Sequence, residues 1–177
     1  VKGIDAQPMS GLYDEMLRRC QVVVLPQPKG AIGKEAAAAL EEFVRNGGGL
    51  LTTHDSVGYR GQPVLMAEIC AGGVKHVRDK HWIVVAEHPV TKGIPRGQQL
   101  PHAYYDHIEL KCGPKGVVLA QAAESGKPVV VCGRFGKGRY VACGLAIGLN
   151  AETKDAAPSG PERLLLENAV MWCGRGE

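Results

Sequence analysis

Residues 40–61, LEEFVRNGGGLLTTHDSVGYRG, contain the pattern that decides the fold. Charged and apolar residues at the start follow helical spacing, and the glycines at 47–49 end the helix. A short apolar strand follows over residues 50–53, after which the chain turns abruptly polar at His54. In open α/β sheets, ligands bind at the carboxyl ends of the strands. We therefore predict a functional site at His54 and its neighbours.

The rest of the chain extends this α/β pattern. The clearest elements are a buried strand over residues 20–25, an amphipathic helix over 33–46 and a helix over 161–172 that begins at a proline. The glycine turn RFGKGR at 134–139 predicts a hairpin. Weaker helices are expected at 11–19 and 63–70, a loop at 91–101, and further strands at 1–5, 74–77, 82–86, 104–111, 116–122, 128–135 and 139–145.

These elements predict one α/β domain over residues 1–177, with a mostly parallel sheet flanked by helices and a β-hairpin near the C-terminus. A chain of 177 residues suffices for one core and is too short for two ordinary domains. The usual first strand of such a sheet has no clear counterpart before residues 20–25. We therefore expect an atypical domain or a fragment of a longer chain that lacks that strand.

Composition excludes several classes of protein. Hydrophobic residues make up 45% and charged residues 22%, as in an ordinary soluble globular protein. The 21 basic and 18 acidic residues are scattered along the chain, so nucleic acid is not expected as a partner. No run approaches the roughly 18 apolar residues of a membrane helix, so no membrane partner is expected. The first residue is valine, which leaves the compartment open.

The six cysteines show neither a CxxC pair nor a zinc-type spacing. Most lie in apolar runs, where a free thiol behaves as a small hydrophobe, and we expect reduced, buried side chains. Cys132 and Cys143 are the exception, because they would lie opposite or nearly opposite each other across the predicted hairpin. A disulfide there would be strained.

His54, Asp55 and Ser56 form the first candidate site. Imidazole titrates near neutral pH and coordinates metals, and a neighbouring carboxylate would orient it, so we assign His54 and Asp55 to catalysis. We assign Ser56 to substrate binding, since DSVG lacks the G-x-S-x-G pattern of a nucleophile elbow. The alternative is a polar turn in which Asp55 or Ser56 caps the next helix.

A second group follows in HAYYDH at residues 102–107. In a strand that starts at Tyr105, the side chains of Tyr105 and His107 share one face. We assign His107 to catalysis, and His102, Tyr105 and Asp106 to ligand binding. Together with His54 these nitrogens and the carboxylate would suit zinc or another transition metal, although the alternative of a solvated strand face leaves metal and cofactor open.

Tyr59 and Arg60 complete the predicted pocket. A tyrosine ring can stack on the face of a pyranose, and an arginine can donate two hydrogen bonds to a carboxylate or to a pair of hydroxyl groups. The alternative is that Arg60 is a surface residue without a ligand. We assign His76, His81 and His88 to structure or surface.

Five motifs in order, GGGLLTTHDSVGYRG, HPVTKGIP, HAYYDHIEL, GRFGKGRYVACGLAIG and ENAVMW, resemble the ThuA-like proteins of the class I glutamine amidotransferase-like superfamily. The resemblance covers roughly residues 13–172 and implies a flavodoxin-like three-layer α/β/α fold. Active amidotransferases of the superfamily carry a cysteine nucleophile at the strand turn, and a histidine and a carboxylate in a late loop. Here the turn TTHDS contains no cysteine and the loop AIGLNAE at 146–152 contains no histidine, so glutaminase activity is not expected.

The ThuA-like branch typically carries a histidine at this turn, which His54 matches. The branch is associated with the utilisation of trehalose-type carbohydrates, so the resemblance implies a small carbohydrate-like ligand. A noncatalytic sugar-binding or interaction module of a larger protein is the alternative. A homo-oligomer or a fusion to other domains fits either function.

Overall fold

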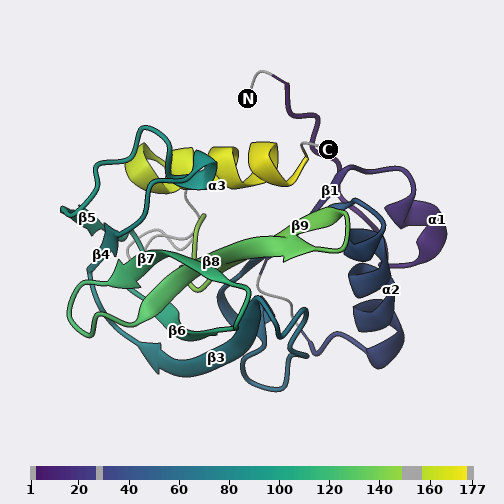
Figure 1. The fold of residues 1–177 in the computed structure, drawn as a ribbon, viewed down its shortest axis with the longest axis horizontal. Coiled ribbons are helices and arrows are strands. Elements are labelled where there is room, and N and C mark those ends of the chain that lie inside the picture. The colour runs from purple at the N-terminus through teal and green to yellow at the C-terminus, as the bar shows by residue number, and fades with distance from the viewer. Residues whose placement is uncertain (1–2, 27–29, 149–156, 175–177) are drawn as a thin grey trace.

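Two β-sheets form the centre of the structure, a computed structural model that describes residues 3–26, 30–148 and 157–174 (Figure 1). Within these ranges the large sheet has seven strands in the order β1-β2-β9-β8-β7-β4-β5, and the small sheet pairs β3 with β6. The strands are β1 (Val22–Leu25), β2 (Gly49–Thr53), β3 (Cys70–Val77), β4 (His81–Val84), β5 (Gln99–Pro101), β6 (His107–Cys112), β7 (Val117–Ala122), β8 (Pro128–Phe135) and β9 (Gly138–Cys143). The helices are α1 (Asp14–Leu17), α2 (Lys34–Arg45) and α3 (Gly160–Cys173), with the 3₁₀ turns η1 (His54–Val57) and η2 (Pro89–Thr91).

The large sheet is mixed. Strands β1, β2 and β9 run parallel, whereas the pairs β9/β8, β8/β7, β7/β4 and β4/β5 are antiparallel, so the sheet is mixed rather than mostly parallel as predicted. Short turns join β7 to β8 and β8 to β9, and only antiparallel strands can be joined in that way. The predicted hairpin is confirmed as β8 and β9, which pair from Val130↔Cys143 to Phe135↔Gly138.

Both faces of the large sheet are covered, which confirms the expected α/β fold with three layers (Figure 1). Alternate strand residues supply two separate cores. On β2, Leu51 belongs to the core that includes Leu165 and Ala169 of α3. Leu50, by contrast, packs in the core that includes Leu40 of α2 and residues of β6. Helix α3 thus covers one face, and α2 with the small sheet covers the other.

Three expected elements differ from the structure. Within the loop expected at 91–101, Gln99–Pro101 form strand β5, which pairs with β4. Residues 63–69 form a loop rather than a helix: Met66 takes a positive φ of 48°, and Leu65, Met66 and Ile69 are buried in the core without helical geometry. Residues 3–5 of the first expected strand are not β-structure, and residues 1–2 lie outside the described ranges.

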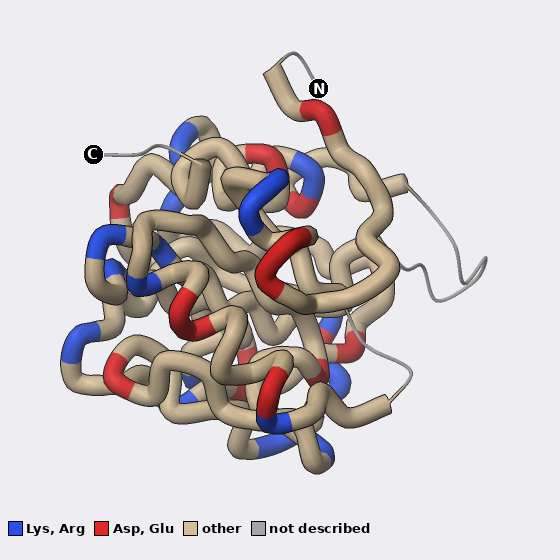
Figure 2. The backbone as a smooth tube through the Cα atoms, turned by 90° about the vertical axis from the view of Figure 1, so that its right-hand side faces the viewer, with Lys and Arg blue, Asp and Glu red and all other residues tan. Residues whose placement is uncertain are grey.

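All six cysteines are free thiols. In the hairpin, Cys132 pairs with Val141 and Cys143 with Val130, so the two cysteines are offset by two residues rather than directly opposite. Charges of both signs are interspersed along the backbone on the side shown in Figure 2. Among the helices of the described ranges, none is both long and apolar enough to cross a bilayer.

Candidate functional site

The site begins where β2 ends. All five residues of β2 are buried between the two covering layers, and the chain turns sharply at the next residue. His54 has a φ of 48°, in the left-handed region that non-glycine residues seldom adopt. Such conformations persist only when the surrounding structure imposes them, and they concentrate at functional sites. The turn places the imidazole at the carboxyl edge of the parallel strands.

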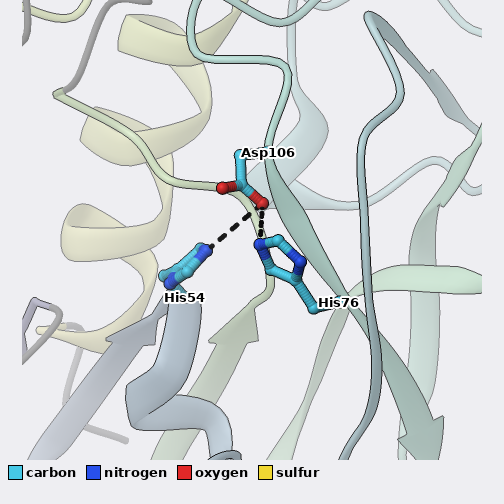
Figure 3. A group of neighbouring side chains, drawn as sticks. All are labelled: His54, His76 and Asp106. Atoms are coloured by element: carbon cyan, nitrogen blue, oxygen red, sulfur yellow. Dashed lines mark ion pairs between the residues drawn. The ribbon is translucent and has the colours of Figure 1, made fainter.

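Two further side chains meet His54 there (Figure 3). His76 comes from β3, and Asp106 comes from the loop that precedes β6. The Nε2 atom of His54 lies 3.9 Å from Oδ1 of Asp106, and Nε2 of His76 contacts the same oxygen. One donor atom from each residue lies within 4.8 Å of the other two, so we call these residues the His54 cluster.

The environment keeps the imidazole of His54 neutral. The residue is only 4% exposed, and this burial lowers its pKa against the opposing effects of the Asp55 and Asp106 carboxylates. Neither ring nitrogen has a hydrogen-bond partner among the described residues. Oδ1 of Asp55 lies 3.3 Å from Nδ1, a placement that favours the proton on Nδ1 and leaves the Nε2 lone pair facing Asp106. A neutral imidazole is the form that binds metal ions.

Two imidazoles and one carboxylate are a donor set that suits zinc or iron(II), with further coordination positions left for water or substrate. In a tetrahedral zinc site with bonds of about 2.0–2.2 Å, donor atoms are roughly 3.4 Å apart. The 3.9 Å between His54 and Asp106 is slightly longer. In such a site His54 and Asp106 would lie slightly closer together, and the contacting atoms of His76 and Asp106 would lie further apart.

The other residues predicted near the turn have separate places. The Ser56 hydroxyl is buried and donates to the Pro26 carbonyl oxygen at 2.6 Å, which ties the turn to the end of β1. Arg60 is exposed, and its guanidinium lies 5.6 Å from the centre of the Tyr59 ring. The positive charge of Arg60 adds to the lowering of the His54 pKa.

Tyr105 adjoins Asp106 at the surface. Its φ is 48°, so β6 begins only at His107 and the alternation expected from Tyr105 onward does not apply. The ring is 38% exposed and stacks with Tyr104, with 6.5 Å between ring centres. Tyr105 thus directly precedes Asp106 in the chain, while its ring contacts Tyr104.

His102 and His107 lie deeper. Nδ1 of His102 is 2.6 Å from Oε1 of Glu162, and its Nε2 is 3.0 Å from the carbonyl oxygen of Asp106. His107 is fully buried, and burial, followed by the charge of His102, lowers its pKa to about 4. The structure thus places both outside the His54 cluster, and neither ring is exposed.

His76 was assigned to structure or surface in the sequence, and the structure corrects that assignment by placing it in the His54 cluster. It reaches the cluster through the pairing of β3 with β6, in which His76 opposes Ile108. That register contains two shifts and joins segments about 30 residues apart. The histidine within the strand expected at 74–77 was the only signal of this in the sequence.

A cleft of about 700 Å³ lies elsewhere, between the η2 region and α3. His88, Lys92, Arg96 and Trp172 are among its lining residues, and none of the residues that the sequence assigned to the site lines it. The chemistry that we can identify lies instead at the end of β2, where donor groups converge.

Comparison with solved structures supports the fold. A cytoplasmic protein from Salmonella typhimurium is 17% identical, with a TM-score of 0.67 over 95% of this chain and 76% of that one. A ThuA-like protein from Parabacteroides merdae is 22% identical, with a TM-score of 0.63 over 89% and 71%. The β-galactosidase of Bacillus circulans is 17% identical, with a TM-score of 0.63 over 89% of this chain but 23% of that one. At these identities the likeness shows the fold alone.

No curated protein sequence matches the chain significantly. The family model for ThuA, described as trehalose utilisation, matches residues 3–173, nearly the whole length. That match covers the strand turn at His54 and the loop that carries Asp106. The chain belongs to the ThuA family, whose description associates it with carbohydrate utilisation.

Proposed function

We propose that the chain is a metal-dependent domain acting on a carbohydrate or related polyol. The observation that carries the proposal is the convergence of His54, His76 and Asp106 at the carboxyl edge of the sheet. Zinc and iron(II) are the ions that this donor set suits. A bound ion would polarise an oxygen of the ligand or lower the pKa of a bound water molecule.

The chain's own residues divide the remaining work. The Asp55 carboxylate lies 3.3 Å from Nδ1 of His54, so with an ion bound it would orient the imidazole as a carboxylate does for many metal-bound histidines. Tyr59 and Tyr105 offer ring faces on which a sugar would stack, and Arg60 offers N–H donors for hydroxyl or carboxylate oxygens. The turn TTHDS contains no cysteine, so we propose that the domain lacks glutaminase activity.

A noncatalytic sugar-binding module is the second candidate. The observation in its favour is that the same fold occupies 23% of the Bacillus circulans β-galactosidase, where it is one part of a larger chain. In a binding module, sugar affinity would depend on Tyr59, Arg60 and Tyr105 and would not require an ion.

The first test is the metal content of the purified protein, measured by elemental mass spectrometry after exposure to zinc and removal of the excess. We expect about one ion per chain in the wild type and almost none in His76→Ala or His54→Asn. Asparagine tolerates the left-handed φ of residue 54 better than alanine does, which limits the strain in that variant. His81→Ala is the matched control, because His81 lies outside the His54 cluster.

Circular dichroism would confirm that each variant is folded. Equal metal content in wild type and His76→Ala would reject the metal site. Calorimetric titration with trehalose, with and without zinc, then separates the two candidate functions. Binding that requires the ion favours the metal-dependent domain, and equal binding without it favours the module.

A further inference from the structure

We propose that Glu162 is a positioning residue that sets Asp106 in the His54 cluster by way of His102. This inference rests on the proposed function, because it assigns a residue that supports the metal ligand Asp106. Glu162 lies in the first turn of α3, about 55 residues further along the chain than Asp106. Glu162 is not itself a member of the His54 cluster.

A single oxygen of Glu162 holds the start of the loop at residues 102–106. Oε1 accepts hydrogen bonds from Nδ1 of His102 at 2.6 Å and from the backbone N–H of Ala103 at 2.8 Å. The carboxylate is 4% exposed and belongs to the first turn of a helix, where the partial positive charge of the helix N-terminus stabilises it. Bonds to a buried charged group are stronger than bonds between neutral groups.

His102 carries this restraint to the other end of the loop. Its Nε2 is 3.0 Å from the carbonyl oxygen of Asp106, and the residue is buried. The two ring nitrogens thus connect the Glu162 carboxylate to the Asp106 carbonyl oxygen. The backbone bond from Tyr105 N–H to the His102 carbonyl oxygen, at 3.2 Å, closes the same loop internally. Helix α3 therefore fixes the backbone from which the Asp106 carboxylate reaches His54 and His76.

Residues that support metal ligands in this way typically change metal affinity 10- to 100-fold when they are replaced. Glu162→Gln keeps the size of the side chain and an acceptor for Ala103 N–H but loses the charge. We expect it to bind zinc at least 10-fold more weakly, with faster hydrogen exchange of the amides of residues 103–106 in the metal-free protein. Glu167→Gln is the control, since Glu167 lies on the same helix and pairs with the exposed Arg163 at 2.6 Å.

A second variant, His102→Gln, tests the same connection, because glutamine cannot donate to both acceptors at once. If the two residues act in series, the zinc affinity of the double variant is no lower than that of the single variant that binds zinc less tightly. Zinc affinity within twofold of the wild type in Glu162→Gln, or additive losses in the double variant, would overturn the proposal.

The exchange measurement separates this inference from the proposed function. A wild-type protein that binds no zinc would reject the metal site, and exchange of the metal-free protein would then decide the inference. Faster exchange of residues 103–106 in Glu162→Gln, but not in Glu167→Gln, would show that α3 holds the loop. Unchanged exchange would show that it does not.

Discussion

At the scale of single residues, burial controls the chemistry of the histidines. His54 and His88 both have a lowered pKa, and in both the first cause is the loss of solvent. The two histidines nevertheless have different roles, because different groups surround them. His54 faces a carboxylate across a short gap and is suited to bind an ion, whereas His88 serves the backbone of η2.

His88 caps η2 in a way that requires a neutral ring. Its Nδ1 accepts from the Val90 N–H at 3.2 Å, and its backbone N–H donates to Thr91 Oγ1 at 3.0 Å. Burial and the charge of Arg139 lower its pKa below the unfolded value of about 6.5. As the pH falls below that value, the unfolded chain takes up a proton before the folded one does. Stability present at neutral pH is therefore lost on acidification.

We predict that His88→Asn reduces this pH dependence, because asparagine retains a capping oxygen and does not titrate. Urea unfolding of both proteins at pH 7.5 and pH 5 would measure the effect. The free energy of unfolding should fall more for the wild type than for the variant over this interval. Equal losses in the two proteins would show that His88 does not contribute.

At the scale of elements, the β8–β9 hairpin is fitted tightly against α2. A Cβ atom on Gly138 would lie 2.1 Å from the carbonyl oxygen of Val44 and 2.2 Å from that of Gly48. These are backbone atoms, which cannot move aside as a flexible side chain does. Glycine is therefore required at the start of β9 because two backbone segments of the chain approach closely there, in addition to any turn preference.

We predict that Gly138→Ala destabilises the protein by about 2–3 kcal/mol, the usual cost of overpacking a filled site. Gly30→Ala is the matched control, since a Cβ there would meet no atom within 4 Å and its φ is not positive. Thermal or urea unfolding of the two variants would measure the difference. A loss in Gly138→Ala no larger than that in Gly30→Ala would contradict the prediction.

At the scale of the whole molecule, the geometry of the His54 cluster depends on how the small sheet packs on the large one. Ile108 and Leu110 of β6 enter the core beneath the large sheet, and the Ile108 N–H donates to the Gly144 carbonyl oxygen at 2.9 Å. Asp106 precedes this anchor by two residues. The placement of the carboxylate is thus coupled to the packing of a whole layer.

We predict that Ile108→Ala lowers the free energy of unfolding by about 2–4 kcal/mol and also weakens zinc binding. Leu119→Ala is the control: Leu119 is equally buried, but it lies on β7 in the core that faces α3. The Leu119→Ala variant should lose a similar free energy of unfolding, and its zinc affinity should be unchanged. The comparison requires urea unfolding and a zinc competition titration of both variants. Equal zinc affinity in the two variants would contradict the prediction, because it would show that the packing of β6 does not affect zinc binding.

Much of the architecture follows from local sequence. The helix at 33–46, the strand that ends before His54, the glycine hairpin and the final helix were all expected and are present, because amphipathic spacing and glycine or proline signals act over a few residues. The loop at 63–69 was expected to be helical for the same reason, yet its apolar residues reach the core without helical geometry. The local sequence pattern indicates which side chains are buried, but it does not determine the backbone conformation of the segment that carries them.

The sequence by itself determined the α/β class and the family, and it predicted a site at His54. Tertiary structure decided that His76 joins this residue, that His102 binds Glu162, and that the second half of the sheet is antiparallel. These outcomes depend on strand register and on contacts between residues as much as 60 positions apart. Register is set by the fit of a buried face against the rest of the core, and no short stretch of sequence contains that information.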